Sequence, residues 1–277
     1  DEGKEYRTLK LYGQEINLLT SAIARMNMFM HGIEEFEIVR GDTLANPGLI
    51  ENGELKKFNV ILANPPYSIK SWDRKAFEND PYGRNIWSTP PQGCADYAFQ
   101  QHIQKSLDLD NGRSISLWPH GILFRDAEMQ MRRKMIEEDL VECVIGLGPN
   151  LFYNSPMEAC LLITKTQKDE SKQGKILFIN AVKEVKQESN MGYLLPEHIN
   201  KTFDAYQRFE TIENFSSLVD SQDVLDKNAN MAINLYVRPD AWQESDGITF
   251  SDAYKQWQQS SNDLKASMDT LFKELSV

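Results

Sequence analysis

An amide and a phenol lie close together at the end of an apolar run, in the tetrapeptide Asn64-Pro65-Pro66-Tyr67. The Asn64 side chain offers one acceptor oxygen, the Pro65 carbonyl offers a second, and proline fixes the backbone that carries both. Two convergent acceptors suit a planar –NH2 group, and the Tyr67 ring suits stacking on the aromatic system that bears it. Acceptors that pull on the hydrogens of a conjugated amine favour a tetrahedral nitrogen with its lone pair released. The tetrapeptide therefore predicts methyl transfer from a sulfonium donor to such an amine, without a metal.

Two acids upstream of the tetrapeptide could address the methyl donor. Glu15 and Asp42, like Asn64, each follow a strand-like segment, and parallel sheets bind ligands at the carboxyl ends of their strands. Each residue also has an ordinary structural interpretation. Asn and Pro are common turn residues, Glu15 suits the first turn of a helix, and Asp42 suits a loop. Glu15 and Asp42 together predict one acid for ribose hydroxyls and one polar side chain for an adenine amine.

The elements that must position these residues alternate between strand and helix patterns. Strand candidates cover residues 8–12, 36–42, 59–63, 113–119, 140–147, 159–165 and 175–181, and helix candidates cover residues 15–32, 95–107 and 125–138. This alternation implies right-handed crossovers. We therefore predict an α/β fold with a doubly wound, mainly parallel, Rossmann-like sheet in residues 1–185. Residues 186–277 are predicted to form a mostly helical extension that ends in a helix over 252–275.

Composition limits the classes of function. The chain has 277 residues with 41% hydrophobic content and a net charge of −11, so nucleic-acid binding requires a local basic patch or a basic partner. The three cysteines lack paired spacing, which indicates a reduced, cytoplasmic protein. The four histidines lack metal-ligand spacing, so no metal is expected. No apolar run is long enough to span a membrane.

A series of ordered blocks resembles the methylation subunits of type I restriction-modification systems, which are adenine-N6 DNA methyltransferases that use S-adenosylmethionine. The blocks are "YGQEINLLTSAIARMNMFMHGI", "GDTL", "ILANPPY", "ADYAFQQHI", "WPHGILFR", "LVECVIGLGPNLFYNSPMEACLLI", "ILFINA" and "DKNANMAINLYV". They extend over nearly the whole chain. Their order is far more specific than any one motif.

The resemblance implies a role for each site residue. Glu15 would contact the cofactor ribose, and Asp42, with Thr43, Leu44 and Asn64, would lie at the cofactor. The segment 64–67 would hold the target adenine. A second aromatic residue would close on the other face of the base, either Phe152 or Tyr153.

Two departures from the family pattern stand out. The Gly-rich cofactor loop of the form Asp/Glu-Pro-x-x-Gly-x-Gly is absent, and the resemblance implies that it lies upstream of Asp1, with a first strand and a helical region. The segment "NSPMEAC" (154–160) replaces a more usual threonine/isoleucine-proline-alanine segment, which affects the second base-facing wall.

The implied partners are duplex DNA, a DNA-specificity subunit and a restriction (endonuclease) subunit, in a hetero-oligomer. Basic residues after the tetrapeptide are candidates for DNA phosphate contacts, or else belong to a solvated loop: Lys70, Arg74, Lys75 and Arg84. The C-terminal helices are either a docking surface for the specificity subunit or solvated. Two other functions stay open, a glutamine-N5 protein methyltransferase and a non-catalytic interaction fragment.

Overall fold

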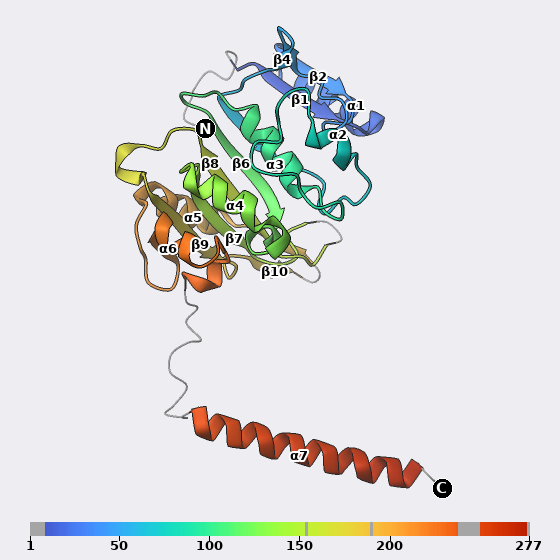
Figure 1. Ribbon diagram of the computed structural model, residues 1–277, viewed down its shortest axis with the longest axis vertical. Coiled ribbons are helices and arrows are strands. Elements are labelled where there is room, and N and C mark those ends of the chain that lie inside the picture. Colours follow the sequence, from blue (N-terminus) through green and yellow to red (C-terminus); the bar gives the residue numbers. More distant parts are fainter. Residues whose placement is uncertain (1–8, 153–154, 189–190, 238–249, 276–277) are drawn as a thin grey trace. The chain divides into compact units, whose positions relative to one another are not determined.

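The computed structural model describes residues 9–152, 155–188, 191–237 and 250–275. The chain divides into two compact units, Asp1–Val237 and Arg238–Val277 (Figure 1). The first contains every element that the sequence predicts for the site.

A six-stranded sheet forms the centre of the first unit, in the order β12-β9-β7-β8-β6-β5. Its strands are β5 (Val60–Ala63), β6 (Arg113–Pro119), β7 (Val141–Leu147), β8 (Ala159–Lys165), β9 (Lys175–Ala181) and β12 (Ser216–Asp220). Four strands share one direction, whereas β8 and β12 run opposite to them. The connection between β7 and β8, residues 148–158, is too short for the helical crossover that a parallel neighbour needs. The predicted Rossmann-like α/β fold is confirmed, as a mixed sheet.

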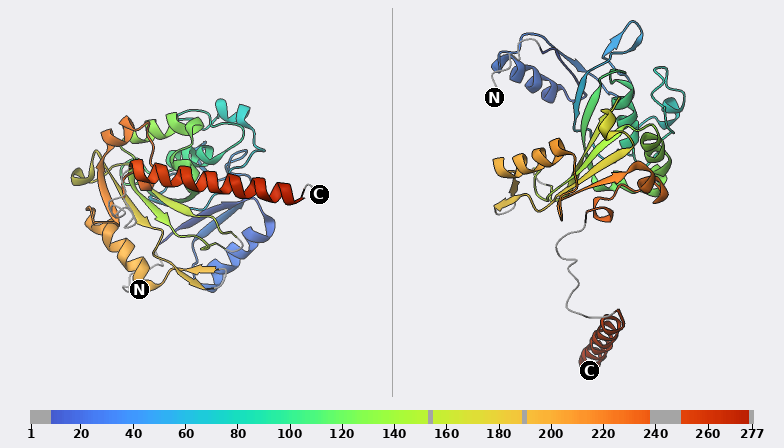
Figure 2. Two further views of the ribbon diagram at one scale, coloured as in Figure 1. Left: turned by 90° about the horizontal axis from the view of Figure 1, so that it is seen from below. Right: turned by 90° about the vertical axis from the view of Figure 1, so that its left-hand side faces the viewer.

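Helices cover both faces of this sheet, which is why its central strands are nearly continuous apolar runs. On one face lie α3 (Asp96–Lys105), α4 (Met129–Glu137) and α6 (Ser221–Asp226), and on the other lies α5 (Pro196–Arg208). Figure 2 shows α5, in orange, across the sheet from the green helices. Every residue of β7 is buried. The sheet is therefore a rigid support for the loops at its strand ends.

A second, two-stranded parallel sheet carries the acidic part of the predicted site. It consists of β1 (Leu11–Glu15) and β2 (Phe36–Arg40), connected through α1 (Leu18–Met30). Among the described residues, β1 pairs only with β2, and β5 pairs only with β6. The predicted helix is present, but its apolar stripe is exposed rather than buried. The exposed apolar residues on or beside α1 are Ile16, Leu18, Leu19, Ile23, Met26, Phe29 and Met30.

The first unit also contains shorter strands and a short helix. They are the hairpin of β3 (Ile50–Glu51) and β4 (Glu54–Leu55), the one-turn helix α2 (Arg74–Glu78), and the hairpin of β10 (Lys186–Glu188) and β11 (Met191–Tyr193). The predicted domain boundary at residues 185 and 186 is wrong, because the first unit extends to Val237. The cause is β12, which adds to the sheet beside β9, and the core packing of Met231, Ile233 and Val237.

The second unit contains the predicted C-terminal helix, which is confirmed as α7 (Phe250–Leu275). Exposed large apolar residues on it are Tyr254, Trp257, Leu264 and Met268. Within the described ranges, no helix combines the length and the apolar character needed to cross a bilayer.

Candidate active site

A cleft of about 590 Å³ lies at the carboxyl ends of β1, β2 and β5. Its lining is formed by Gln14, Glu15, Ile16, Gly41, Asp42, Thr43, Asn64, Pro65, Pro66, Tyr67, Ile69, Phe99, Phe152, Ser155 and Met157. The three segments predicted to act together therefore meet in one cavity. A smaller cleft of about 390 Å³ beside β12 contains none of the residues singled out from the sequence.

The two acids are oriented by their own backbone. Glu15 ends β1, and its Oε1 accepts a hydrogen bond from the Asn17 backbone N–H at 2.7 Å. Asp42 follows β2, and its Oδ1 accepts from the backbone N–H groups of Leu44 at 2.8 Å and Ala45 at 3.1 Å. Such short turns are typical of aspartate. Each carboxylate is thereby held by a charge-assisted bond to the backbone at the edge of the cleft.

Gln14 connects the two acid-bearing loops by hydrogen bonds. The sequence did not indicate this role. Its Nε2 donates to the Asn46 carbonyl at 3.0 Å, and its Oε1 accepts from the Gly48 N–H at 3.0 Å. The Gly41 N–H donates to the Glu15 carbonyl at 3.1 Å. A Cβ at Gly48 would lie 2.4 Å from the Val39 side chain, so the loop needs glycine there. These contacts fix the position of Asp42 relative to Glu15.

The Asn64–Tyr67 tetrapeptide leaves β5 and turns into the cleft. The Tyr67 hydroxyl donates to Asn64 Oδ1 at 2.8 Å, so the phenol holds the amide in place. The Tyr67 ring is partly buried and lies 6.5 Å from Trp118, centroid to centroid. Burial raises the pKa of the Tyr67 phenol, which keeps it a hydrogen-bond donor at neutral pH. After Tyr67 the backbone reverses through a positive φ of 52° at Ser68.

Phe152 supplies an aromatic ring on another wall of the cleft. Both Phe152 and Tyr67 line the cavity and pack against the α5-facing core cluster. The Phe152 carbonyl accepts from the Ser155 N–H at 3.0 Å, which turns the chain at this point. Tyr153, the alternative candidate, lies outside the described residues. Of the two candidates, Phe152 is the one among the described residues, and it lines the same cleft as Tyr67.

A buried ionic cluster supports the tetrapeptide from behind. The Ser68 N–H donates to Asp96 Oδ1 at 2.6 Å, and Asp96 Oδ2 accepts from Arg125 at 2.5 Å. Arg125 also donates to Glu128 at 2.7 Å and 3.1 Å. Ligand atoms of Cys94, Asp96 and Glu128 lie within 4.8 Å of one another. Because the Arg125 guanidinium already pairs with both carboxyl groups, we propose no metal ion at this cluster.

The ionisable side chains of the described cleft lining are those of Glu15, Asp42 and Tyr67. His102 is excluded as a proton carrier because burial lowers its pKa to about 3, which keeps the ring neutral. Burial also raises the pKa of the Cys94 thiol to about 12 and the pKa values of Cys143 and Cys160 above their ordinary range. All three cysteines are free. The cleft is suited to binding and polarising a substrate rather than to nucleophilic catalysis by the protein.

Two of the four predicted phosphate contacts remain accessible. Lys70 and Lys75 are exposed. Arg74 is partly committed to the protein, since it pairs with Glu78 at 2.5 Å and donates to the Pro90 carbonyl at 2.8 Å.

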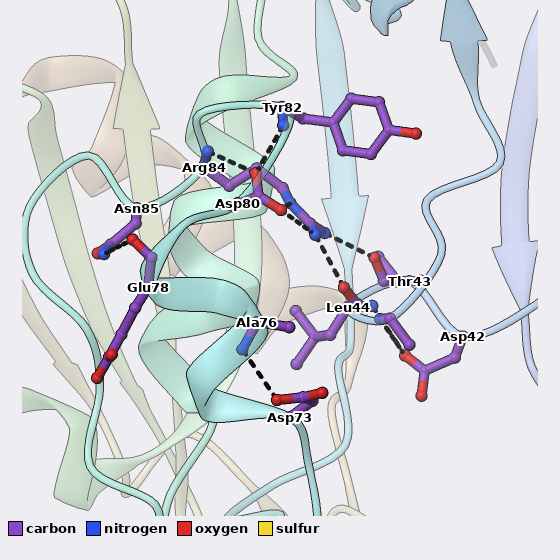
Figure 3. A network of polar contacts seen from close by, with 11 residues as sticks. Asp42, Thr43, Leu44, Asp73, Ala76, Glu78, Asp80, Tyr82, Arg84 and Asn85 are labelled. Carbon is purple, nitrogen blue, oxygen red and sulfur yellow. Dashed lines mark hydrogen bonds and ion pairs between the residues drawn. The ribbon is translucent and has the colours of Figure 1, made fainter.

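The prediction for Arg84 is wrong. Arg84 is 2% exposed, pairs with Asp80 at 2.6 Å, and donates to the carbonyls of Thr43 and Leu44 at 2.8 Å each (Figure 3). A guanidinium in this position cannot reach a phosphate in solution. The sequence places an ion-pair partner, Asp80, four residues away, but it does not show that the pair is buried. The carbonyl of Leu44, a residue predicted to contact the cofactor, accepts a hydrogen bond in this network.

The model of the N-6 DNA Methylase family matches residues 1–245. The type I restriction enzyme MjaVII methylase subunit of Methanocaldococcus jannaschii is 34% identical over 241 residues, which are 83% of this chain and 41% of that protein. The MpnII methylase subunit of Mycoplasma pneumoniae is 32% identical over 253 residues, covering 87% of this chain and 46% of that protein. This chain thus spans less than half the length of these relatives.

A solved structure has a similar fold. The methyltransferase subunit of a type I restriction-modification system from Streptococcus thermophilus superposes with a TM-score of 0.76 at 33% identity. The match covers 83% of this chain and 49% of that one.

Proposed function

This chain belongs to the N-6 DNA Methylase family, and from that premise we propose that its cleft transfers a methyl group from S-adenosylmethionine to N6 of an adenine in duplex DNA. The predicted resemblance to type I methylation subunits is confirmed by the relatives described above. The observation that carries the proposal is the meeting of Glu15, Asp42 and the tetrapeptide 64–67 in one cleft.

The chemistry of the cleft lining fits the proposed cofactor. Glu15 and Asp42 supply carboxylate acceptors, and no lysine or arginine is among the lining residues described. Such a set of acceptors suits hydroxyl and amine groups and disfavours a polyphosphate. Glu15 would accept from ribose hydroxyls, and Asp42 with Thr43 would lie at the adenine. When bound, S-adenosylmethionine would supply a methyl carbon activated by its positively charged sulfur. The lone pair of the amine would form the new N–C bond as the C–S bond breaks, with that electron pair left on sulfur, and the methylated nitrogen would lose one proton.

The tetrapeptide binds the adenine and activates its exocyclic amine. Asn64 Oδ1 and the Pro65 carbonyl accept from the two hydrogens of the exocyclic amine, which favours a tetrahedral nitrogen. Tyr67 and Phe152 bind the faces of the base. In the structure Asn64 Oδ1 already accepts from the Tyr67 hydroxyl at 2.8 Å, so the acceptor is oriented before the base arrives. When the base binds, its amine replaces the Tyr67 hydroxyl as the hydrogen-bond donor to Asn64 Oδ1.

Reaching the amine requires extrusion of the adenine from the duplex, because the base pair otherwise occupies that group. Lys70 and Lys75 are the exposed basic residues near the cleft from the predicted set and would contact phosphate. With a net charge of −11, the chain is poorly suited to reading DNA sequence alone. We assign sequence reading to a specificity subunit and cleavage to a restriction subunit, in a hetero-oligomer.

Helix α7 is the surface that suits the specificity subunit. Its described apolar residues Tyr254, Trp257, Leu264 and Met268 are exposed. The interval of three between Tyr254 and Trp257, and of four between Leu264 and Met268, is typical of helix-on-helix packing. An apolar stripe of this kind fits a helical partner rather than DNA.

A transfer assay tests the proposed function. The full-length natural protein would be supplied with methyl-labelled S-adenosylmethionine and duplex DNA, with and without its specificity subunit. Label in N6-methyladenine is the expected product. A glutamine-bearing release-factor substrate provides the comparison, and label on that amide with none on DNA would reject the proposal. No transfer to either would favour the non-catalytic alternative.

A further inference from the structure

Residues 68–96 form a closed segment between the tetrapeptide and α3. The segment begins and ends at one hydrogen bond, from the Ser68 N–H to Asp96 Oδ1 at 2.6 Å. Between these ends it reaches the loop after β2, where Arg84 contacts Thr43 and Leu44. One stretch of chain therefore contacts both the base-binding turn and the loop that carries Asp42.

Arg84 is fully engaged within the protein. Its Nε and one terminal nitrogen donate to Asp80 Oδ1 at 3.0 Å and 2.6 Å, and its two terminal nitrogens donate to the Thr43 and Leu44 carbonyls at 2.8 Å each. Asp80 Oδ2 accepts in turn from the backbone N–H groups of Tyr82 and Arg84 at 3.1 Å and 2.8 Å. The side chains of Arg84 and Asp80 are 3% and 2% exposed. Such a pair is costly to bury unless its geometry is this complete.

The Thr43–Leu44 peptide connects Arg84 to Asp42. The carbonyl of this peptide accepts from Arg84 at 2.8 Å, and its N–H donates to Asp42 Oδ1 at 2.8 Å (Figure 3). A peptide group is planar, so fixing the direction of the carbonyl fixes the direction of the N–H. The orientation of the Asp42 carboxylate therefore depends on the position of the Arg84 guanidinium.

We propose that Arg84, held by Asp80, is a positioning residue that sets Asp42 for the cofactor through the Thr43–Leu44 peptide. This inference rests on the proposed function, since it concerns the same cleft. Arginine suits the task because its planar fork reaches two carbonyls and a carboxylate at once. A lysine ammonium keeps the charge but cannot reproduce that fork.

Cofactor affinity separates positioning from a merely structural ion pair. The variants are Arg84→Lys and Arg84→Gln, in the full-length natural protein, with S-adenosylmethionine affinity measured by calorimetry and the melting temperature recorded. We expect Arg84→Lys to weaken binding about tenfold, as for the loss of one charge-assisted hydrogen bond, and Arg84→Gln to weaken it further.

Lys168→Gln is the matched control. Lys168 is a buried cation that pairs with Asp139 at 2.6 Å and donates to the Lys175 carbonyl at 2.7 Å, at the amino end of β9. We expect it to lower the melting temperature and to leave cofactor affinity within about twofold. If Lys168→Gln weakens binding as much as the Arg84 variants do, Arg84 acts only through stability and the proposal is overturned.

A double-mutant cycle tests the route through Asp42. In an Asp42→Asn background we expect Arg84→Lys to change affinity by less than about threefold, because residues that act through one another are not additive. A full tenfold effect in that background would overturn the proposal. Failure of the wild-type protein to bind S-adenosylmethionine would instead reject the proposed function, independently of Arg84. Arg84→Lys keeps a positive charge next to Asp80, so we expect this variant to fold. The double-mutant cycle can then be measured even if Arg84→Gln fails to fold.

Discussion

Asn64 offers its side-chain oxygen only where charge develops on the substrate amine, so its loss should affect rate more than binding. We expect Asn64→Ala to lower single-turnover methyl transfer about 100- to 1,000-fold, the range for losing one placed electrostatic group. Folding and cofactor affinity should stay near those of the wild type. The control is Asn59→Ala, which removes an amide immediately before β5, where it bonds Asn111 away from the cleft. Near-normal turnover by Asn64→Ala would refute the role of Asn64.

Tyr67 combines a ring that can stack with a hydroxyl that bonds Asn64 at 2.8 Å. Stacking on a base is worth about 1–3 kcal/mol and needs only the ring. We therefore expect Tyr67→Ala to weaken binding of an extruded base more than Tyr67→Phe does. Fluorescence of a 2-aminopurine at the target position would report the extrusion. Equal damage from both variants would mean that the hydroxyl, not the ring, is the working group.

The ion pair of Asp80 should be visible in the pH dependence of stability. Burial acts to raise the pKa of Asp80, but hydrogen bonds and charge from Arg84 outweigh it and hold the pKa below its usual value. A carboxyl with a lowered folded pKa contributes stability above its unfolded pKa of about 3.9, and loses it as pH falls through the folded pKa. Compared with Asp80→Asn, the wild type should have a stability advantage that is constant above about pH 5 and shrinks below about pH 4. Urea midpoints across this range would measure it, and a constant difference down to about pH 3 would contradict the pairing.

At the scale of elements, the 68–96 segment presents Lys70 and Lys75 to solvent. Each phosphate contact releases a counterion, so the slope of log affinity against log salt should flatten by about 1 for each lysine lost. We expect Lys70→Gln and Lys75→Gln to weaken binding equally on specific and non-specific duplexes. Lys134→Gln on α4, also exposed, serves as the control. If the salt dependence of binding is unchanged in the double variant, Lys70 and Lys75 do not contact phosphate and belong to a solvated loop.

The strands that were easiest to predict are long and mostly buried. Residues 113–119, 159–165 and 175–181 are strands with the predicted bounds, because apolar runs between polar turns leave little choice of structure. In contrast β12, with the sequence Ser-Ser-Leu-Val-Asp, is short and polar at both ends, and only its pairing with β9 makes it a strand. Its sequence therefore did not predict a strand.

The candidate site was predictable where it depended on chain order. Glu15, Asp42 and Asn64 follow strand ends, and the rule for parallel strands brings such ends together. The supports of these residues were not predictable, because Gln14, Asp96 and Arg84 bond to partners distant in sequence. A sequence does not distinguish an exposed arginine from a buried one until the fold supplies its acceptors. For this reason Arg84 was misassigned while Lys70 and Lys75 were placed correctly on the surface.

At the scale of the whole molecule, the division after Val237 predicts independent stability of the first unit. Val237 is 2% exposed and belongs to the main core cluster, so a chain that stops there keeps that core. We expect removal of residues 238–277 to leave the melting temperature and cofactor affinity unchanged and to abolish association with the specificity subunit. Sedimentation of mixtures with that subunit would measure the loss. Unimpaired association would place the docking surface on the first unit.

The three cysteines lie at two different depths of the first unit. Cys94 is partly buried in the 68–96 segment, while Cys143 and Cys160 are buried in the neighbouring central strands β7 and β8. A thiol-labelling reagent can reach Cys94 when the segment opens locally, but it reaches the strand cysteines only when the sheet itself unfolds. The alkylation rate of Cys94 thus measures how often the contacts around Asp96 open. The alkylation rate of Cys143 and Cys160 measures global unfolding. The wild-type chain therefore reports local opening and global unfolding through its own cysteines, without any introduced probe. We expect cofactor binding to slow the alkylation of Cys94.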